Sequence, residues 1–260
     1  MVQAVYRSSH PLNKNPHYHD CHQIIFVVKG EVDFSVNNKK LRAATGDVAV
    51  FSRYENHSVV GCSDGYERIV LHIDPNVVGR KSQVYSLLTD RPIGFCNIID
   101  VSENMELIED IFSNILIEHN NPSKLADEME QLLVKQLLIV VYRCASVNFD
   151  NTYDDVVVSV KRQFENEYDK PFTLAMLAKQ HSLSVSSLSH RFKSATGVSV
   201  MEYLKSCRMA NAKQMLAETE CSMGEIVERC GFSDGSNFSR EFRKLTDMSP
   251  SDFRKKYKAE

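Results

Sequence analysis

The sequence predicts an α+β protein of two domains, in which a small β-barrel with a pair of helices precedes an all-helical domain. Three observations carry this prediction. The chain has 260 residues, short strand-like runs give way to helical periodicity after residue 100, and the second half contains an internal repeat. At roughly 100–200 residues per domain, this length accommodates two hydrophobic cores. We expect the first domain at residues 1–146, a linker at 147–154 and the second domain at 155–258.

Composition restricts the class of protein. Hydrophobic residues make up 43% and charged residues 25% of the chain, which is typical of a globular protein. No apolar stretch approaches the ~18–20 residues of a membrane helix, and the first ten residues lack the layout of a secretory signal. The seven cysteines include no CxxC pair, which favours reduced thiols over a disulfide framework or a zinc knuckle. We therefore expect a soluble cytoplasmic protein with no membrane partner.

Charge is distributed unevenly along the chain. Residues 1–150 contain 14 basic and 19 acidic side chains, whereas residues 170–258 contain 15 basic and 9 acidic ones, a net charge of +6. A basic second domain on a nearly neutral chain indicates a polyanionic partner for that domain. An ordinary solvated helical surface can carry the same charge, so this observation alone leaves both interpretations open.

The barrel is expected at about residues 5–75. Residues 24–36 contain two β-branched, aromatic-rich runs around Lys29-Gly30, which predicts a hairpin. Turn signals at Asn37-Asn38 and Gly46-Asp47 separate further short strands. Strands separated by turn signals every 8–12 residues are typical of a sandwich or small barrel.

Two amphipathic helices are expected within residues 102–146. Apolar residues recur there at three- and four-residue spacing: Met105, Ile108, Ile111, Phe112, Ile115 and Leu116, then Met129, Leu132, Leu133, Leu137 and Val140. Their apolar faces need a partner. Packing onto their own domain and formation of a homodimer interface are both consistent with the pattern.

The internal repeat relates residues 183–199 to residues 232–249. At a spacing of 50 residues, Phe192 matches Phe242 and Ser189 matches Ser239. Each copy reads as a short helix, a tight turn and a second helix, with Ser184 and Ser233 in the capping position. This order is that of a helix-turn-helix, in which the first helix supports the second and the second enters the major groove of double-stranded DNA.

Helical geometry selects the side chains that can reach DNA. Burial of Leu188 and Phe192 in one copy, and of Phe238 and Phe242 in the other, leaves six candidates for base contacts: Ser186, Ser189, His190, Ser236, Ser239 and Arg240. Candidates for phosphate contacts lie one turn further along: Lys193, Arg243 and Lys244. The alternative is a surface of ion pairs on a helical bundle, but two matched copies favour DNA binding.

Residues 155–258 resemble the DNA-binding domain of the AraC/XylS family of bacterial transcription regulators. The similarity is most specific in residues 230–234 (CGFSD), 238–240 (FSR), 242–244 (FRK) and 249–254 (SPSDFR). Asn237 departs from the aromatic residue that is usual in the family, and Asp247 from the usual glycine. The resemblance implies two subdomains joined by a helix around residues 202–217, which enter successive major grooves. It also implies an activator that acts on RNA polymerase.

Histidines mark the start of the first long strand. His17, His19 and Gln23 share a face of an extended chain, and His57 follows a later strand. Residues 6–73 resemble the cupin-type sensor domain that precedes the DNA-binding part in many members of the family. The pattern also resembles the metal set of cupin enzymes, but Gln23 replaces their Glu ligand. Because a neutral amide is a poor ligand compared with a carboxylate, we expect no cofactor.

Three interpretations of these residues remain open. The first is polar filling at the mouth of the barrel. The second is a small-molecule effector site, with a sugar suggested by the family resemblance, formed by Arg7, His19, Gln23, Phe26, Phe34, Tyr54 and His57. The third is a metal-dependent enzyme or metal sensor that uses His17, His19 and His57. The leading hypothesis is an effector-controlled regulator rather than an enzyme, with no catalytic residue assigned. The alternatives are a metal-dependent enzyme or metal sensor fused to a DNA-binding module, and a regulator whose barrel is only a dimerisation scaffold.

Overall fold

The computed structural model describes residues 2–9, 17–37, 39–74, 82–89, 91, 95–121, 123–145, 154–246 and 248–257. These residues form two compact units, 1–154 and 155–260. The expected linker at 147–154 lies outside the described residues, apart from Asp154. Within the described part of the chain, no helix is both long enough and apolar enough to span a bilayer.

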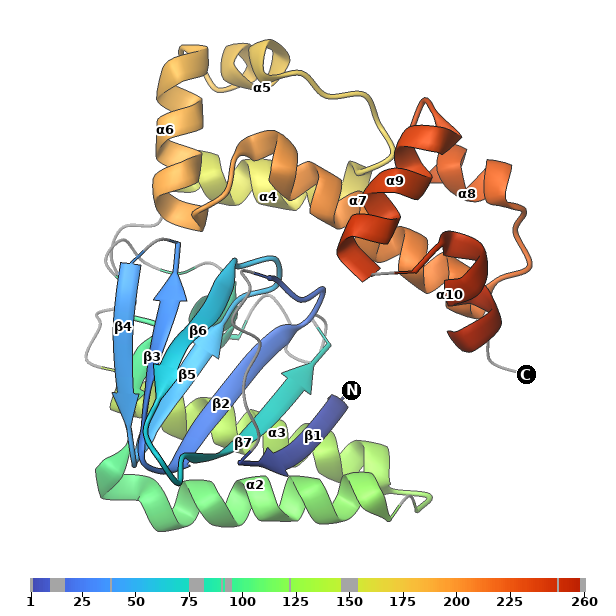
Figure 1. Cartoon of the computed structure of the whole chain (residues 1–260). Helices are drawn as coiled ribbons and strands as arrows, with labels where there is room; N and C mark the ends of the chain where they lie inside the picture. Colours follow the sequence, from blue (N-terminus) through green and yellow to red (C-terminus); the bar gives the residue numbers. More distant parts are fainter. Residues whose placement is uncertain are drawn as a thin grey trace. The chain divides into compact units, whose positions relative to one another are not determined.

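Two β-sheets build the first unit (Figure 1). The larger sheet has the strand order β1-β7-β2-β5-β8, and the smaller sheet has the order β4-β3-β6. The strands are β1 (Val2–Ser8), β2 (His22–Lys29), β3 (Glu31–Val36), β4 (Lys39–Ala44), β5 (Asp47–Phe51), β6 (His57–Cys62), β7 (Glu67–Ile73) and β8 (Ile98–Asp100). This arrangement agrees with the predicted cupin-like barrel.

Strand β2 is buried on both faces from its first residue to Val27. Its odd-numbered residues, such as Ile25, join Phe34 and Phe51 in the core between the two sheets. Its even-numbered residues, such as Phe26, join a second core between the larger sheet and the helices. The two-residue alternation of strand side chains therefore assigns each residue of β2 to one of two cores.

The hairpin predicted for residues 24–36 is wrong. Strand β2 pairs with β5 and β7, whereas β3 pairs with β4 and β6 in the other sheet. The chain passes from the larger sheet to the smaller one at Gly30, whose φ is +83°. A Cβ at this position would lie 2.6 Å from Ser63 Oγ. A tight glycine turn between two apolar runs permits either a hairpin or a crossing between sheets, so the local pattern does not decide between them.

Helices cover the other face of the larger sheet. They are α1 (Tyr85–Leu88), the 3-10 turn η1 (Ser102–Asn104), α2 (Met105–Asn120) and α3 (Ala126–Cys144). Figure 1 shows α2 and α3 lying side by side beneath the strands. Phe112 of α2 stacks on Phe26 of β2 with ring centroids 5.8 Å apart. The apolar faces of the predicted helix pair are thus covered in large part by their own domain.

The second unit is helical. Its elements are α4 (Asp155–Glu167), α5 (Leu174–Gln180), α6 (Val185–Thr196), α7 (Val200–Glu218), α8 (Met223–Arg229), α9 (Gly235–Thr246) and α10 (Pro250–Tyr257). The two copies of the sequence repeat form the helix pairs α5–α6 and α8–α9, with α7 between them. In the first turn, Leu183 N donates to Ala178 O at 2.8 Å; in the second, Phe232 N donates to Val227 O at 2.9 Å. The repeat in sequence is therefore also a repeat in backbone hydrogen bonding.

The caps of the two second helices differ. The hydroxyl of Ser184 accepts a backbone N–H from the first turn of α6 at 3.1 Å, as predicted. The predicted cap at Ser233 is wrong, because the carboxylate of Asp234 accepts the first-turn amides of α9 at 3.0 and 2.9 Å. Both residue types are strong N-caps, so the sequence alone does not distinguish two that are adjacent.

Candidate nucleic-acid interface and barrel site

Helix α6 presents the predicted polar face of the first copy. Leu188 and Phe192 are fully buried beneath it. On the opposite face Ser186, His190 and Lys193 are exposed and Ser189 is half-buried. Residues three and four apart lie on the same face of a helix, so burial of Leu188 and Phe192 on one face leaves the predicted polar residues on the opposite face.

Helix α9 repeats this arrangement with more basic residues. Phe238 and Phe242 are buried, and the residues predicted to contact DNA are exposed on the other side: Ser236, Ser239, Arg240, Arg243 and Lys244. The structure therefore places each predicted set on the outer surface of the second helix of its pair.

The cations of α9 differ in their partners. Arg240 Nη2 donates to the neutral Asn237 Oδ1 at 2.9 Å, so that bond does not neutralise the guanidinium. Arg243 takes part in no ion pair among the described residues. Lys244 Nζ lies 3.0 Å from Glu241 Oε1, which partly neutralises the ammonium. Arg240 and Arg243 thus carry the available positive charge.

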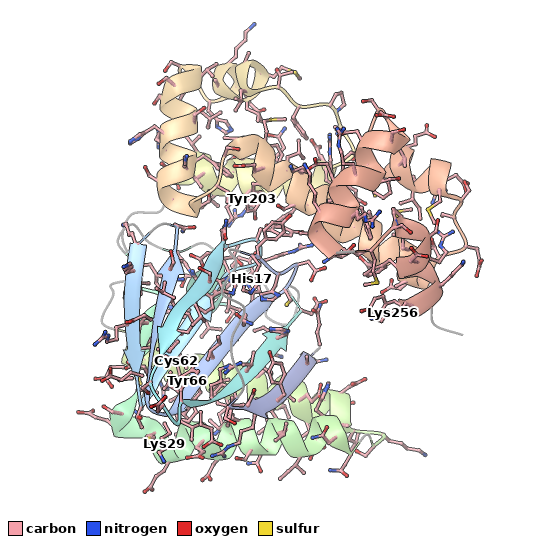
Figure 2. All side chains as sticks on the ribbon, viewed as in Figure 1. His17, Lys29, Cys62, Tyr66, Tyr203 and Lys256 are labelled. Carbon is pink, nitrogen blue, oxygen red and sulfur yellow. The ribbon has the colours of Figure 1, made fainter. Side chains whose placement is uncertain are left out.

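Helix α7 connects the two helix-turn-helix pairs. Lys205 Nζ reaches Glu241 of α9 at 2.7 Å, and this bond together with the one from Lys244 lowers the pKa of Glu241 to about 2. Arg208 Nε donates to Tyr168 O, just after α4, at 2.7 Å. Tyr203 of α7, labelled in Figure 2, packs against the first pair at Phe192, with ring centroids 5.6 Å apart. Polar and apolar contacts therefore tie both pairs to one helix.

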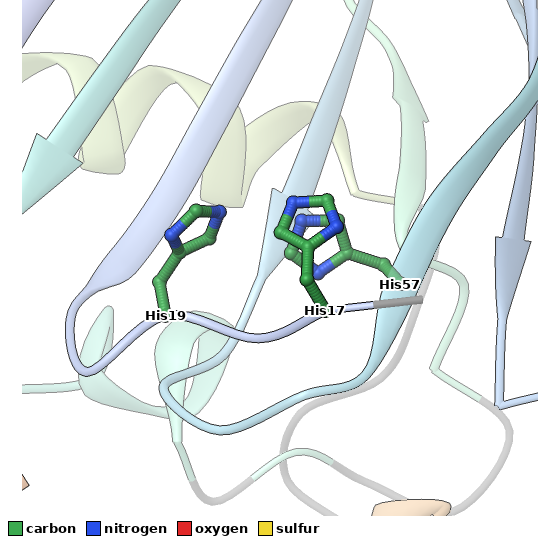
Figure 3. A group of neighbouring side chains, drawn as sticks. All are labelled: His17, His19 and His57. Atoms are coloured by element: carbon green, nitrogen blue, oxygen red, sulfur yellow. The ribbon is translucent and has the colours of Figure 1, made fainter. Parts of the chain in front are cut away.

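The barrel site begins with three histidines from two segments. His17 and His57 exchange backbone hydrogen bonds of 3.0 and 2.9 Å, and the rings of His17 and His19 are 5.0 Å apart. One ring nitrogen from each of the three histidines lies within 4.8 Å of the others. Figure 3 shows their imidazoles on one side of the segment that leads into β2. Figure 2 places His17 at the end of the barrel opposite Lys29 and Tyr66.

His57 is held as a neutral imidazole. Its Nδ1 lies 2.9 Å from Glu55 O, an acceptor, so Nδ1 carries the proton and Nε2 the lone pair. Its ring stacks on Phe51 at 4.2 Å. Burial disfavours the charged form and lowers the pKa of His57 to about 4. The ring therefore offers a nitrogen acceptor to the cluster at neutral pH.

His72 belongs to the same cluster but is not among the residues predicted from the sequence. It is the register partner of Gln23 on the neighbouring strand, and Gln23 Nε2 lies 2.7 Å from His72 Nε2. The ring of His72 is 4.8 Å from that of His19, and burial lowers its pKa. Gln23 Oε1 is buried and has no hydrogen-bond partner among the described residues. A polar ligand would satisfy this oxygen.

Two predicted effector residues lie elsewhere. Phe26 points into the core between the larger sheet and the helices, on the opposite face of β2 from Gln23. Arg7 pairs with Glu67 at 2.6 Å and with Glu109 of α2 at 3.2 Å, so it lies on the helix side of the sheet. Both assignments to the barrel interior are therefore wrong.

The other predicted wall residues are on the correct side. Phe34 lies in the core between the sheets, 5.3 Å from the ring of Phe51. Tyr54 is buried, and its backbone N–H donates to His19 O at 2.9 Å. The barrel set that the structure brings together is therefore His17, His19, Gln23, Tyr54, His57 and His72, with Phe34 deeper in the barrel.

The donor set of this cluster has a definite chemistry. Neutral imidazole nitrogens suit Zn²⁺ and other borderline divalent ions. Gln23 supplies an amide oxygen where a carboxylate would add charge. The three imidazole nitrogens lie near enough to one another, within 4.8 Å, to converge on an ion, but the cluster itself contributes no negative charge to hold it. The same nitrogens and the free amide oxygen equally fit hydroxyl groups of an uncharged ligand.

Comparisons with known proteins agree with both halves of this description. A family model described as a helix-turn-helix domain matches residues 177–256, and a cupin domain model matches residues 10–73. The chain is 25% identical over 251 residues to the HTH-type transcriptional activator RhaR of Yersinia pseudotuberculosis serotype O:3 (strain YPIII), covering 93% of this chain and 84% of that protein. A RhaR of Mannheimia succiniciproducens is 27% identical over 157 residues, which are 60% of this chain and 56% of the relative.

Solved structures share the fold of the whole chain. Apo ToxT from Vibrio cholerae strain SCE256 aligns with a TM-score of 0.59 and 15% identity, covering 98% of this chain and 96% of that one. ToxT from Vibrio cholerae O395 aligns with a TM-score of 0.57 and 15% identity, covering 97% and 96%. At this identity the similarity establishes the fold.

Proposed function

The chain belongs to the AraC/XylS family of transcription regulators, and we propose that it is a sequence-specific DNA-binding regulator controlled by a small molecule in its barrel. One observation carries the DNA-binding half of the proposal. Two matched helix-turn-helix pairs present exposed polar and basic residues on their second helices, and a single helix connects them. Such a unit can place two recognition helices in successive major grooves.

Base reading and phosphate binding fall to different residues. Arg240 lies in the middle of α9, and a guanidinium can donate to O6 and N7 of guanine together. Lys193 and Arg243 lie one turn nearer the C-termini of their helices and suit phosphates. We therefore assign sequence specificity mainly to Arg240, with Ser186, Ser189, His190, Ser236 and Ser239 beside it.

Binding to duplex DNA tests this assignment. The intact protein first selects a preferred site from a randomised duplex library, and fluorescence anisotropy then compares that site with random DNA. We expect Arg240→Ala to cost ~1–3 kcal/mol on the selected site and to relax preference at one base pair. Lys193→Ala should weaken all sequences alike and reduce the salt dependence by about one charge. An equal loss on both DNAs for Arg240→Ala would contradict its role in base reading.

The barrel is proposed to bind an uncharged polar effector, such as a sugar. Burial keeps His57 and His72 neutral near pH 7 by lowering each pKa, and Gln23 Oε1 lacks a partner among the described residues. Hydroxyl groups both donate and accept, so they match this mixture of acceptors and donors. Ligand binding would then favour one arrangement of the regulator over another.

Thermal unfolding against a panel of sugars, organic acids and divalent metals tests the effector. A ligand at 100 times its dissociation constant adds ~2.7 kcal/mol of stability. Gln23→Ala should abolish the shift, whereas Arg7→Ala should preserve it, because Arg7 lies on the helix side of the sheet. If no metabolite shifts the unfolding temperature, the barrel serves only as a dimerisation scaffold.

A divalent metal is the second candidate ligand. The observation that favours it is the approach of His17, His19 and His57, whose ligand nitrogens lie within 4.8 Å of one another. Metal that survives dialysis in stoichiometric amount, and disappears in His57→Ala, would support a metal sensor. Wild-type protein free of metal after dialysis, with a thermal shift from a sugar, would decide for the uncharged effector.

A homodimer through α3 completes the proposal. Leu125, Met129, Leu132 and Ile139 are 64%, 43%, 61% and 42% exposed. They follow the four-and-three spacing of a helix that packs against another helix. Glu128 and Lys135 flank this stripe, and neither takes part in an ion pair among the described residues. An antiparallel copy that places Met129 on the partner's Leu132 brings Glu128 beside the partner's Lys135.

Charge exchange tests this interface. Glu128→Lys and Lys135→Glu should each weaken self-association, since each places like charges in contact. An equimolar mixture of the two variants should restore dimers, which sedimentation measures. A wild-type protein that stays monomeric, or a mixture that fails to associate, would exclude the α3 interface.

Activation is proposed to act through RNA polymerase in the cytoplasm. The relatives carry the description of transcriptional activators. Transcription in vitro from a promoter that contains the selected site, with and without the effector, measures the effect. A decrease in transcript would identify a repressor instead.

A further inference from the structure

The start of α9 carries a bond between two exposed side chains three residues apart. Arg240 Nη2 donates to Asn237 Oδ1 at 2.9 Å. In the first copy the corresponding positions hold Ser187 and His190, which are a different pair chemically. Asn237 also stands where the family resemblance leads one to expect an aromatic residue.

The backbone under Asn237 is fixed. The carboxylate of Asp234 accepts the N–H of Ser236 at 3.0 Å and that of Asn237 at 2.9 Å, and the next residue, Phe238, is buried. Asn237 therefore holds the Arg240 guanidinium toward the N-terminal end of α9. Residues at the N-terminal end of a recognition helix are those that contact base edges.

The bond also changes what Asn237 can offer to a base. An asparagine ordinarily reads adenine by accepting from N6 and donating to N7. Here one lone pair of its oxygen already accepts from Arg240, whereas both N–H donors of its NH2 group are left for DNA. Arg240 has donors alone. Together the two side chains present N–H donors and require acceptors opposite them.

We infer that Asn237 and Arg240 act as one donor unit that reads two adjacent base pairs. Arg240 selects guanine through O6 and N7, and Asn237 selects guanine or thymine, through O6 or O4, in preference to adenine. Residues three apart on a recognition helix can reach successive bases. Asn237 is thus both a positioning residue for Arg240 and a specificity-determining residue. This inference rests on the proposed DNA-binding function.

The test uses the full chain and a randomised duplex library. Sites selected by the wild-type protein should contain guanine next to guanine or thymine. Anisotropy on duplexes with single base changes then gives the discrimination at each of the two positions. Asn237→Ala should reduce the preference for guanine opposite Arg240 by roughly 5- to 20-fold and remove the preference at the neighbouring base pair.

Two further variants separate the roles of Asn237. Asn237→Asp keeps an acceptor for Arg240 but loses the NH2 group, so it should retain the guanine preference and lose the preference beside it. Ser187→Ala, at the matching position of the first copy, should change neither. Replacement of the guanine by 7-deazaguanine, which lacks the N7 acceptor, should weaken binding of the wild type at least fivefold and of Arg240→Ala less than twofold.

The outcomes are distinguishable. Failure of the wild-type protein to enrich any site would contradict the proposed DNA-binding function itself. Enrichment of a site whose discrimination is unchanged in Asn237→Ala would overturn this inference and leave DNA binding intact. Selection of adenine opposite Asn237 would also overturn it. Unchanged thermal unfolding of the exposed-site variants excludes misfolding as the cause of any loss.

Discussion

Gly231 is the position at which one added methyl group should most disturb the DNA-binding unit. Its φ is +72°, and a Cβ there would lie 2.7 Å from Asp169 O and 3.0 Å from Arg208 Nη2. A left-handed conformation costs a non-glycine residue ~1–2 kcal/mol. The overlap adds to that cost, because Asp169 O is backbone and Arg208 is itself bound to Tyr168 O at 2.7 Å. We expect Gly231→Ala to destabilise this unit by about 2–4 kcal/mol.

Hydrogen exchange with mass spectrometry on the full chain measures this effect for each unit separately. A loss of 2 kcal/mol corresponds to about 30-fold faster exchange in α8 and α9, whereas the barrel strands should be unaffected. Gly235→Ala is the matched control, since its Cβ would meet only Val227 Cγ2 at 4.0 Å. Unchanged protection of α8 and α9 in Gly231→Ala would refute the reasoning.

The barrel, the proposed phosphate contacts and the ion pair on the helix side of the larger sheet give three further predictions. Because burial lowers the pKa of His57 to about 4 from 6.5, the first unit should be fully stabilised above about pH 6.5. It should lose ~3 kcal/mol as the pH falls toward 4, as urea unfolding would show, and His57→Gln should flatten this dependence. Arg243→Ala should reduce the salt dependence of DNA binding by about one charge, and Lys244→Ala by less, because Glu241 already pairs with Lys244; equal slopes would contradict this. Arg7→Ala should lower the unfolding free energy by less than about 1 kcal/mol, since its pairs are partly exposed; a larger loss in urea unfolding would show that the pair is structural.

The helical unit could be predicted closely from the sequence because its information is local. A buried Phe192 or Phe242 determines, through the 3.6-residue period, which neighbours on the same helix face outward. The repeat supplied the second copy independently. The prediction failed at the choice between Ser233 and Asp234 as the cap, which depends on a one-residue shift in where α9 begins.

The barrel site could be predicted in part. The two-residue alternation of an extended chain groups His17, His19 and Gln23, and the structure brings all three to one cluster around His72. The same alternation excludes Phe26 from the face of Gln23, since an odd and an even position of one strand point to opposite sides. The placement of Phe26 in the effector set was therefore an error that the sequence alone could have corrected.

Arg7 and His72 show which feature of a β-sheet cannot be predicted from its strands taken one at a time. Alternation tells which residues of one strand share a face, but which faces of two strands coincide depends on their register. Arg7 is opposite Ile69 and therefore on the helix side, whereas Gln23 is opposite His72 and therefore inside the barrel. A shift of one residue in either pairing would exchange these outcomes. The paired residues are 49 apart for Gln23 and His72 and 62 apart for Arg7 and Ile69, and packing of the whole core decides such pairings. The residues of a site that spans several strands can therefore be placed only when the pairing of those strands is known.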